Sequence, residues 1–271
     1  MKIEMCNLFF SYGEKELLKG IDLQLEPGRF TVLLGPNGSG KSTLLKLLTG
    51  ELKPDSGEVK LDGRPLEEYR IRERARHIGV VMQSAPPALD FTVREYVLIG
   101  RNARMSPFAP AGEADRTAVE KAMKLFQVDH LADRSCNQLS GGERQRTMLA
   151  AAWALEPEIF LLDEAVSAVD PAHTFAVLKI LRECAKTKTV FMIMHDLVLA
   201  GNFADRALLL KDGRIAADGT PGEVLTAENL LSVYGLHVSV SRGPNGALAI
   251  LPGNRIMTPA TALRSMLREG T

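Results

Sequence analysis

Eight residues decide the fold of this chain: Gly35-Pro36-Asn37-Gly38-Ser39-Gly40-Lys41-Ser42. They follow an apolar run, Phe30–Leu34, and precede a helical run at residues 43–49 that Gly50 is placed to end. The spacing is G-x-x-x-x-G-K-[ST], and a strand before it with a helix after it is the context that a phosphate-binding loop requires. The stretch therefore predicts a nucleotide-binding loop; an ordinary glycine-rich turn is the alternative.

The chemistry of phosphate binding explains the residue types in this loop. Glycines let the backbone wrap closely around phosphate oxygens, and the N-terminus of a helix adds partial positive charge. Lys41 is expected to pair with the β and γ phosphates of a nucleotide, and Ser42 to ligate Mg²⁺. The nucleotide contacts expected in the loop are Gly35, Pro36, Asn37, Gly38, Ser39, Gly40, Lys41, Ser42 and Thr43.

Two acidic residues follow a second apolar run, residues 159–162. Asp163 and Glu164 would lie at the carboxyl edge of a parallel sheet, where ligands bind in open α/β folds. A buried carboxylate pair is costly unless a cation compensates it, so we expect Asp163 and Ser42 to hold Mg²⁺. Glu164 is then the expected general base for the attacking water. The alternative is that both acids only solvate a strand end.

The composition excludes several classes of protein. The chain has 271 residues, of which 45% are hydrophobic and 24% charged, a balance typical of folded soluble proteins. Lys+Arg 33 and Asp+Glu 33 cancel, which argues against a broad nucleic-acid-binding face. The three cysteines show neither disulfide nor zinc spacing and favour a reducing compartment. The longest apolar run, residues 148–155, is much shorter than the about 20 residues of a membrane span, and we expect no signal peptide.

The apolar runs alternate with helical patterns, which is typical of α/β architecture. Continuous apolar runs at residues 30–34, 159–162 and 190–194 predict strands buried on both faces of a parallel sheet. Asp62-Gly63 and Asp212-Gly213 lie between short apolar segments, as hairpin turns do, and predict an antiparallel edge. We therefore expect the P-loop NTPase fold, with a RecA-like parallel core.

A helical insertion and a C-terminal extension complete the expected organisation. Amphipathic spacing in the middle of the chain predicts a helical subdomain at about residues 86–150, inserted into a domain of residues 1–235. Residues 236–271 are expected to form a hairpin around Pro244-Asn245-Gly246 and a short helix at residues 258–269. No function is assigned to this extension. The helical spacing is carried by Val119, Ala122, Met123 and Phe126.

A second glycine-rich stretch, Leu139-Ser140-Gly141-Gly142-Glu143, precedes a long helical run. Ser140 and Glu143 fit the S-x-x-E capping box, and capping alone is the simplest interpretation. Two glycines in a first helical turn cost about 1 kcal/mol each relative to alanine, however, so a cap alone would favour other residues. We infer that the bare amides beside Ser140 form a second anion site at a helix N-terminus.

The stretch 139–143, followed by Arg144-Gln145-Arg146, resembles the signature motif of the ATP-binding subunits of ABC transporters. The resemblance extends over about residues 1–235, in the order of the family. It implies a head-to-tail homodimer in which Ser140, Gly141 and Gly142 of one chain complete the ATP site on Lys41 of the other. Ala165-Val166, where the family usually has Pro-Thr, is a departure that we expect to alter loop stiffness without loss of hydrolysis.

The same resemblance implies roles for four single residues. Tyr12 matches the aromatic residue that stacks on adenine, and Gln83 the glutamine that contacts Mg²⁺ or the attacking water. His195 matches the histidine that reaches the γ phosphate, and Asp170 the loop that crosses the dimer interface. Without the resemblance, Tyr12 would be ascribed to packing and His195 to solvation or capping, and Gln83 alone would carry little information.

Further motifs resemble the metal-chelate importers, which carry iron-siderophores, haem or vitamin B12. This resemblance implies a bacterial or archaeal importer with two separate transmembrane permease subunits, an extracytoplasmic substrate-binding protein as an indirect partner, and a peripheral position on the cytoplasmic face of the inner membrane. The alternatives are an ABC ATPase of another transporter class, a non-transport ABC protein and a small-molecule kinase. The motifs are Thr92-Val93-Arg94-Glu95, Gly100-Arg101, Asp170-Pro171-Ala172-His173, His195-Asp196-Leu197, Gly219-Thr220-Pro221 and Glu223-Val224-Leu225-Thr226.

Overall fold

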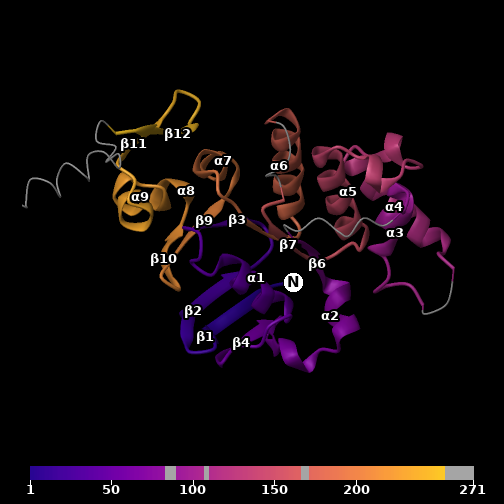
Figure 1. Cartoon of the computed structure of the whole chain (residues 1–271), viewed down its shortest axis with the longest axis horizontal. Helices are drawn as coiled ribbons and strands as arrows, with labels where there is room; N and C mark the ends of the chain where they lie inside the picture. The colour runs from indigo at the N-terminus through magenta and orange to yellow at the C-terminus, as the bar shows by residue number, and fades with distance from the viewer. Residues whose placement is uncertain (83–89, 107–109, 166–170, 254–271) are drawn as a thin grey trace, which may run out of the picture.

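A six-stranded sheet forms the centre of the protein, in the order β10-β9-β3-β8-β7-β6 (Figure 1). The structure is a computed structural model that describes residues 1–82, 90–106, 110–165 and 171–253. Neighbouring strands are parallel except for β10, which pairs antiparallel with β9. The strands are β3 (Phe30–Leu34), β6 (Ile78–Val81), β7 (Ile159–Asp163), β8 (Thr189–Ile193), β9 (Arg206–Lys211) and β10 (Arg214–Gly219).

Apolar side chains cover both faces of the parallel strands. Every residue of β3, β7 and β8 is buried, as the continuous apolar runs predict. Successive residues of a strand point to opposite faces: Val32 joins one apolar cluster and Leu33 the other. Helices cover these faces: α1 (Lys41–Thr49), α6 (Pro171–Ala185), α7 (Leu197–Phe203), α8 (Pro221–Val224) and α9 (Ala227–Tyr234).

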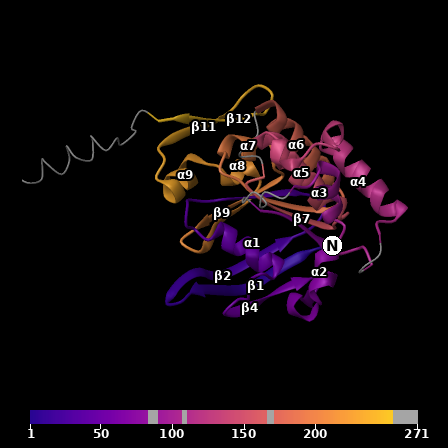
Figure 2. The same ribbon diagram turned by 45° about the vertical axis from the view of Figure 1, so that its right-hand side comes forward.

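A separate antiparallel sheet lies beyond α1, in the order β2-β1-β4-β5 (Figure 2). Both expected hairpin turns form, because φ is positive at Asp62 (48°), Gly63 (81°), Asp212 (48°) and Gly213 (78°), as a type I′ turn requires. The predicted antiparallel edge is therefore confirmed. The elements of this layer are β1 (Ile3–Tyr12), β2 (Lys15–Leu25), β4 (Ser56–Leu61), β5 (Arg64–Pro65), the 3₁₀ turn Leu66–Glu68 and α2 (Ile71–His77).

A group of helices lies between β6 and β7 in the chain and beside the sheet in space (Figure 1). Its helices are α3 (Val93–Ile99), α4 (Glu113–Leu125) and α5 (Gly141–Ala154), with 3₁₀ turns at Asp129–Leu131 and Cys136–Gln138. The helical insertion is therefore present, and the apolar stripe of α4 is buried as its spacing predicts: Val119, Ala122, Met123 and Phe126 are each at most 2% exposed.

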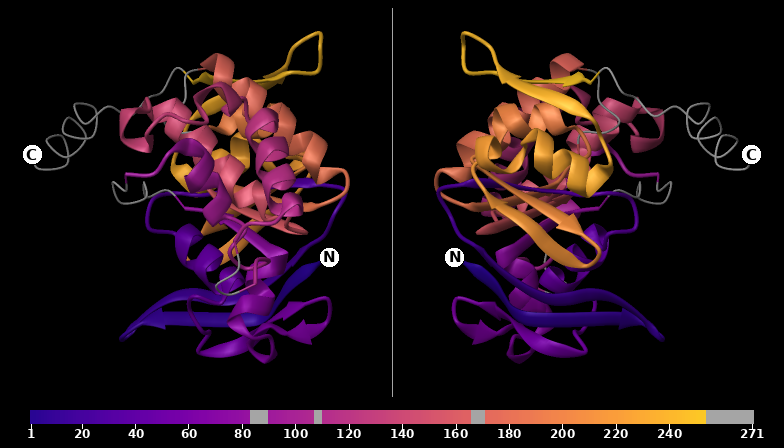
Figure 3. Two further views of the ribbon diagram at one scale, coloured as in Figure 1. Left: turned by 90° about the vertical axis from the view of Figure 1, so that its right-hand side faces the viewer. Right: turned by 90° about the vertical axis from the view of Figure 1, so that its left-hand side faces the viewer.

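A hairpin of β11 (Val238–Arg242) and β12 (Leu248–Pro252) packs on α7. The Asn202 side chain accepts a hydrogen bond from Leu248 N (2.8 Å) and donates one to Leu248 O (3.1 Å). Figure 3 shows this hairpin on the side of the molecule away from β1 and β4. The helix expected at residues 258–269 lies outside the described residues. No described helix is long and apolar enough to cross a membrane.

Candidate active site

The loop after β3 depends on glycine at three positions. A Cβ atom at Gly35 would overlap the carbonyl oxygen of Leu210 in β9, so the loop can approach that strand only without a side chain. Gly38 (φ 77°) and Gly40 (φ 104°) adopt backbone angles that L-residues rarely populate. Helix α1 begins at Lys41, two residues before the expected position, and ends at Gly50 in the left-handed conformation, as predicted.

Lys41 turns its ammonium group back into this loop. The Nζ atom donates hydrogen bonds to Gly35 O (2.7 Å) and Pro36 O (2.9 Å), and the residue is 7% exposed. Burial lowers the pKa of Lys41, and the carboxylates of Glu164 and Asp163 act in the opposite direction. Ser39 Oγ is also buried and has no hydrogen-bond partner among the described residues. The loop thus holds a cation and an unpaired hydroxyl, which an oxyanion would satisfy.

Asp163 ends β7 in a setting that suits a divalent cation. It is 3% exposed, and its Oδ1 atom has no hydrogen-bond partner within the described part of the chain. Burial raises the pKa of this carboxyl, and a hydrogen bond with Ser42 opposes the rise. Mg²⁺ prefers oxygen ligands and is usually held by one or two protein groups together with substrate phosphates. Asp163 and Ser42 therefore fit the expected metal site.

Glu164 and His195 meet although they come from different strands. Glu164 follows β7 in a left-handed turn (φ 51°), where its N–H donates to Ile193 O (3.1 Å) at the end of β8. Its Oε1 atom lies 2.5 Å from Nε2 of His195. The Glu164 side chain is 15% exposed and that of His195 45% exposed. A half-enclosed carboxylate with an imidazole partner can accept a proton from water and be held in place while it does so.

Ser140 caps helix α5 as the sequence predicts. Its hydroxyl accepts a hydrogen bond from Glu143 N (3.3 Å), and Glu143 Oε2 accepts one from Ser140 N (2.8 Å). This last bond, from the Ser140 backbone, lowers the pKa of Glu143. Ser140 and Gly141 are exposed, so the helix N-terminus is open to an anion from outside the chain.

Two contacts to the site were not anticipated from the sequence. The Gln145 amide donates a hydrogen bond to Glu164 O (3.2 Å). This bond joins α5, the helix that begins at the signature motif, to the backbone of the expected base. Tyr234 on α9 hydrogen-bonds with the backbone of Gly35, and burial raises its pKa to about 12. Gln145 stands in the quoted Arg144-Gln145-Arg146 stretch, but no local pattern marks Tyr234, because only folding brings α9 to the loop.

Of the other three residues that the resemblance implies, the structure describes only Tyr12. Tyr12 ends β1, is 53% exposed and packs edge-on against Phe10, with ring centroids 4.9 Å apart. An exposed ring of this kind offers a face to a planar ligand. Gln83 and Asp170 lie outside the described residues.

Lys41, at the start of α1 in the loop after β3, and Asp163 and Glu164, at the end of β7, lie at the carboxyl edge of the parallel sheet. This arrangement is that of a P-loop nucleoside triphosphatase. Residues 18–167 match the family described as "ABC transporter". The chain therefore belongs to the ABC transporter family, as an ATP-binding subunit that hydrolyses ATP. The family resemblance drawn from the sequence is confirmed.

Two relatives are similar over nearly their whole length. The ferric enterobactin transport ATP-binding protein FepC of Escherichia coli is 38% identical, over 94% of this chain and 95% of the relative. The hemin import ATP-binding protein HmuV of Pseudomonas aeruginosa is 43% identical, over 88% of this chain and 94% of the relative.

Two solved structures share the fold. A metal-chelate type ABC transporter in an inward-facing conformation is 29% identical, with a TM-score of 0.80 over 94% of this chain and 99% of that one. A dimeric ATP-binding cassette in a post-hydrolysis state, bound to ADP and phosphate, is 30% identical, with a TM-score of 0.71 over 81% of this chain and 98% of that one. These similarities confirm the expected fold.

Proposed function

We propose that this chain powers a bacterial or archaeal ABC importer for an iron-siderophore, haem or cobalamin. The juxtaposition of Lys41, Asp163, Glu164 and His195 at one sheet edge carries the assignment of ATP hydrolysis. The names of the ferric enterobactin and hemin relatives support the cargo class. The division into an ATPase domain of residues 1–235 and an extension of residues 236–271 is part of the same proposal.

Each described residue has a distinct task in hydrolysis. Lys41 leaves the carbonyls of Gly35 and Pro36 for the β and γ phosphates, because a phosphate oxygen carries more negative charge than a carbonyl. Glu164 takes a proton from the water that attacks the γ phosphate. His195 holds the Glu164 carboxylate through Nε2 and presents its exposed imidazole to the γ phosphate.

Ser42 and Asp163 would hold Mg²⁺, with Gln83 as the third group that the family resemblance implies. The unpaired Oδ1 of Asp163 supports this assignment. When bound, Mg²⁺ neutralises charge on the phosphate oxygens. Tyr12 would stack on adenine, and the loop residues from Gly35 to Thr43 would surround the phosphates.

The complete catalytic unit would be a homodimer. Ser140, Gly141 and Gly142 of one subunit would bind the ATP held by the other subunit, with Asp170 at the interface. The exposed N-terminus of α5 supports this arrangement, as does the dimer of the ADP-bound relative. Two transmembrane permease subunits would hold the dimer peripherally at the cytoplasmic face of the membrane, with a substrate-binding protein outside it and no nucleic acid involved.

Reconstitution tests this function. The chain is purified with permease subunits encoded beside its gene and placed in vesicles with the cognate binding protein. Ferric siderophore, haem and cobalamin are then offered separately. One of them should accumulate in an ATP-dependent way, and Glu164→Gln should abolish accumulation while the complex still assembles. ATP hydrolysis in the vesicles with none of the three cargoes accumulating, or transfer of labelled phosphate to a small acceptor, would contradict the proposal.

A further inference from the structure

Gly100-Arg101, one of the importer-like motifs, makes contacts that the proposed mechanism does not use. A Cβ atom at Gly100 would overlap the carbonyl oxygen of Ala151, so the end of α3 lies directly against the backbone of α5. Arg101 is 6% exposed and donates to Ala154 O (2.9 Å) and Glu156 Oε2 (2.8 Å). Carbonyls at a helix C-terminus lack partners within the helix, and cationic donors satisfy them.

Arg104 also donates hydrogen bonds to backbone carbonyls at the end of α5. Its Nε atom donates to Leu155 O (2.6 Å), and its Nη2 atom donates to Glu156 O (3.1 Å) and to Arg76 O (3.2 Å). The guanidinium thus bonds α5 on one side and α2 on the other. A planar group with several donors suits such bridging, and a lysine would not reproduce its geometry.

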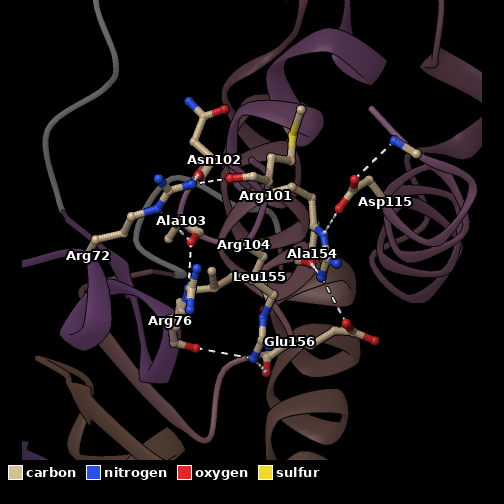
Figure 4. Close-up of polar contacts among 12 residues, drawn as sticks. Arg72, Arg76, Arg101, Asn102, Ala103, Arg104, Asp115, Ala154, Leu155 and Glu156 are labelled. Carbon is tan, nitrogen blue, oxygen red and sulfur yellow. Dashed lines mark hydrogen bonds and ion pairs between the residues drawn. The ribbon is translucent and has the colours of Figure 1, made fainter. Parts of the chain in front are cut away.

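Two arginines of α2 donate hydrogen bonds to the backbone around Arg104. Arg76 donates from Nε to Ala103 O (2.8 Å), and Arg72 donates to Ala103 O (3.2 Å), Asn102 O (3.4 Å) and Met105 O. Figure 4 shows these side chains converging on one short segment of backbone. We refer to Arg72, Arg76, Arg101 and Arg104 as the arginine cluster.

The arginine cluster connects two parts of the active site through secondary structure. Helix α2 runs directly into β6, which pairs with β7, with Val81 opposite Leu162 and so next to Asp163. Helix α5 begins at Ser140. The cluster therefore ties the amino end of β6, the strand that pairs with the acid-bearing β7, to the far end of the helix that bears the serine–glycine turn.

Because α5 is long, the contacts at its C-terminus affect the position of Ser140 at its N-terminus. Its 14 residues span about 21 Å at 1.5 Å per residue. A tilt of about 10° about its C-terminus would move Ser140 by about 4 Å. Hydrogen bonds to phosphate fail when donor and acceptor separate by much less than that. The direction of α5 therefore decides whether Ser140 can reach an anion on another chain.

Three members of the arginine cluster contribute more to the direction of helix α5 than to the stability of the fold. Arg72, Arg76 and Arg104 are exposed, and exposed hydrogen bonds add little net stability. Arg101 differs, because it is buried between Asp115 (3.0 Å) and Glu156. Its removal would leave the partly buried Asp115 carboxylate and the Ala154 carbonyl without this donor and would destabilise the fold, so it is a poor test.

We propose that Arg72, Arg76 and Arg104 are positioning residues for ATP hydrolysis: they set the direction of α5 and so place Ser140 on the ATP of a second copy of this chain. The inference rests on the proposed function, since it requires the dimer. It predicts a defect in dimer closure that leaves ATP binding to a single chain unchanged.

The test uses the full chain with Glu164→Gln, which is expected to bind ATP and to hydrolyse it only slowly. Arg104→Ala is added, and the matched control is Arg116→Ala, an exposed arginine of α4 outside the cluster. Sedimentation with Mg²⁺-ATP measures the dimer dissociation constant, and a fluorescent nucleotide measures binding to the monomer. We expect Arg104→Ala to raise the dimer dissociation constant about tenfold, with monomer binding within about twofold of the parent and no change in the control.

A second measurement separates positioning from loss of structure. In an otherwise natural chain, Arg104→Ala should slow ATP hydrolysis at low protein concentration and recover at high concentration, because mass action restores the dimer. A loss that is equal at all concentrations, or a dimer constant that does not change, overturns the inference. If Arg104→Ala lowers the unfolding temperature, Arg72→Ala carries the same test, because the carbonyls of α5 keep their partners. A parent that binds ATP without dimerising refutes the proposed dimer itself.

Discussion

Nε2 of His195 lies 2.5 Å from Oε1 of Glu164, although 31 positions separate the two residues in the chain. The parallel pairing of β7 with β8 brings their ends together, and the left-handed backbone of Glu164 directs the chain back toward β8. Contacts within the chain therefore hold the carboxylate in one direction. An oriented base loses less entropy when the reaction begins.

Glu164→Gln should bind ATP normally and reduce turnover by about 10²- to 10⁴-fold, because an amide of the same shape cannot accept the proton of water. Turnover is followed by phosphate release, and binding by a fluorescent nucleotide. Glu158→Gln is the matched control, since Glu158 also pairs with a histidine, His77, at 3.3 Å, away from the phosphate loop. Near-normal turnover in Glu164→Gln would remove Glu164 from the role of base.

Ser140→Arg should leave ATP binding to the monomer intact and block dimer closure, because a long side chain would occupy the exposed N-terminus of α5. The substitution also removes the helix cap, a loss worth about 1 kcal/mol. Ser140→Ala removes the cap without adding bulk and therefore isolates the steric effect. Light scattering with Mg²⁺-ATP reports the dimer.

Lys41→Ala should weaken nucleotide binding to the monomer itself, which Ser140→Arg leaves intact. Mixed dimers of Lys41→Ala with Ser140→Arg test whether the two chains share one ATP site.

Asp163→Asn should stabilise the ligand-free protein at neutral pH and abolish Mg²⁺-dependent hydrolysis. Burial raises the pKa of Asp163 above its ordinary 3.8, so this group favours folding when protonated and opposes it as pH rises through the raised pKa. The free energy of unfolding should rise by about 1–2 kcal/mol near pH 8, and this gain should shrink as pH falls toward 3.8.

Denaturant titrations at several pH values measure the effect of Asp163→Asn. Asp133→Asn serves as the control, because the Asp133 side chain is 94% exposed and its neutralisation should change stability little. A stability gain that is the same at all pH values would show that ionisation of Asp163 is not its cause.

Gly100→Ala should destabilise the chain by about 1–3 kcal/mol, because the added methyl group would overlap Ala151 O in the backbone of α5. Gly243→Ala is the control: within 4 Å its Cβ atom would meet only Ala247 O, at 3.8 Å. Thermal unfolding of both variants measures the difference. Equal unfolding temperatures would show that α3 and α5 separate without cost.

Local features of the structure could be predicted because neighbouring residues produce them. The strand Phe30–Leu34, the turn at Asp62-Gly63 and the capping box of Ser140 each depend on residues only a few positions apart. The start of α1 was misplaced by two residues, since Gly40 ends the loop in a left-handed conformation that spacing alone does not reveal.

The sequence by itself determined the phosphate loop, the buried strands at residues 30–34, 159–162 and 190–194, and the family, because glycine positions, apolar periodicity and motif spacing are properties of short segments. The tertiary structure alone decided which distant groups touch. The contacts of Glu164 with His195 and Gln145, the packing of Tyr234 on Gly35 and the arginine cluster all join residues from separate elements. Such contacts depend on strand order and helix direction, which are fixed only when the two apolar clusters close on the sheet.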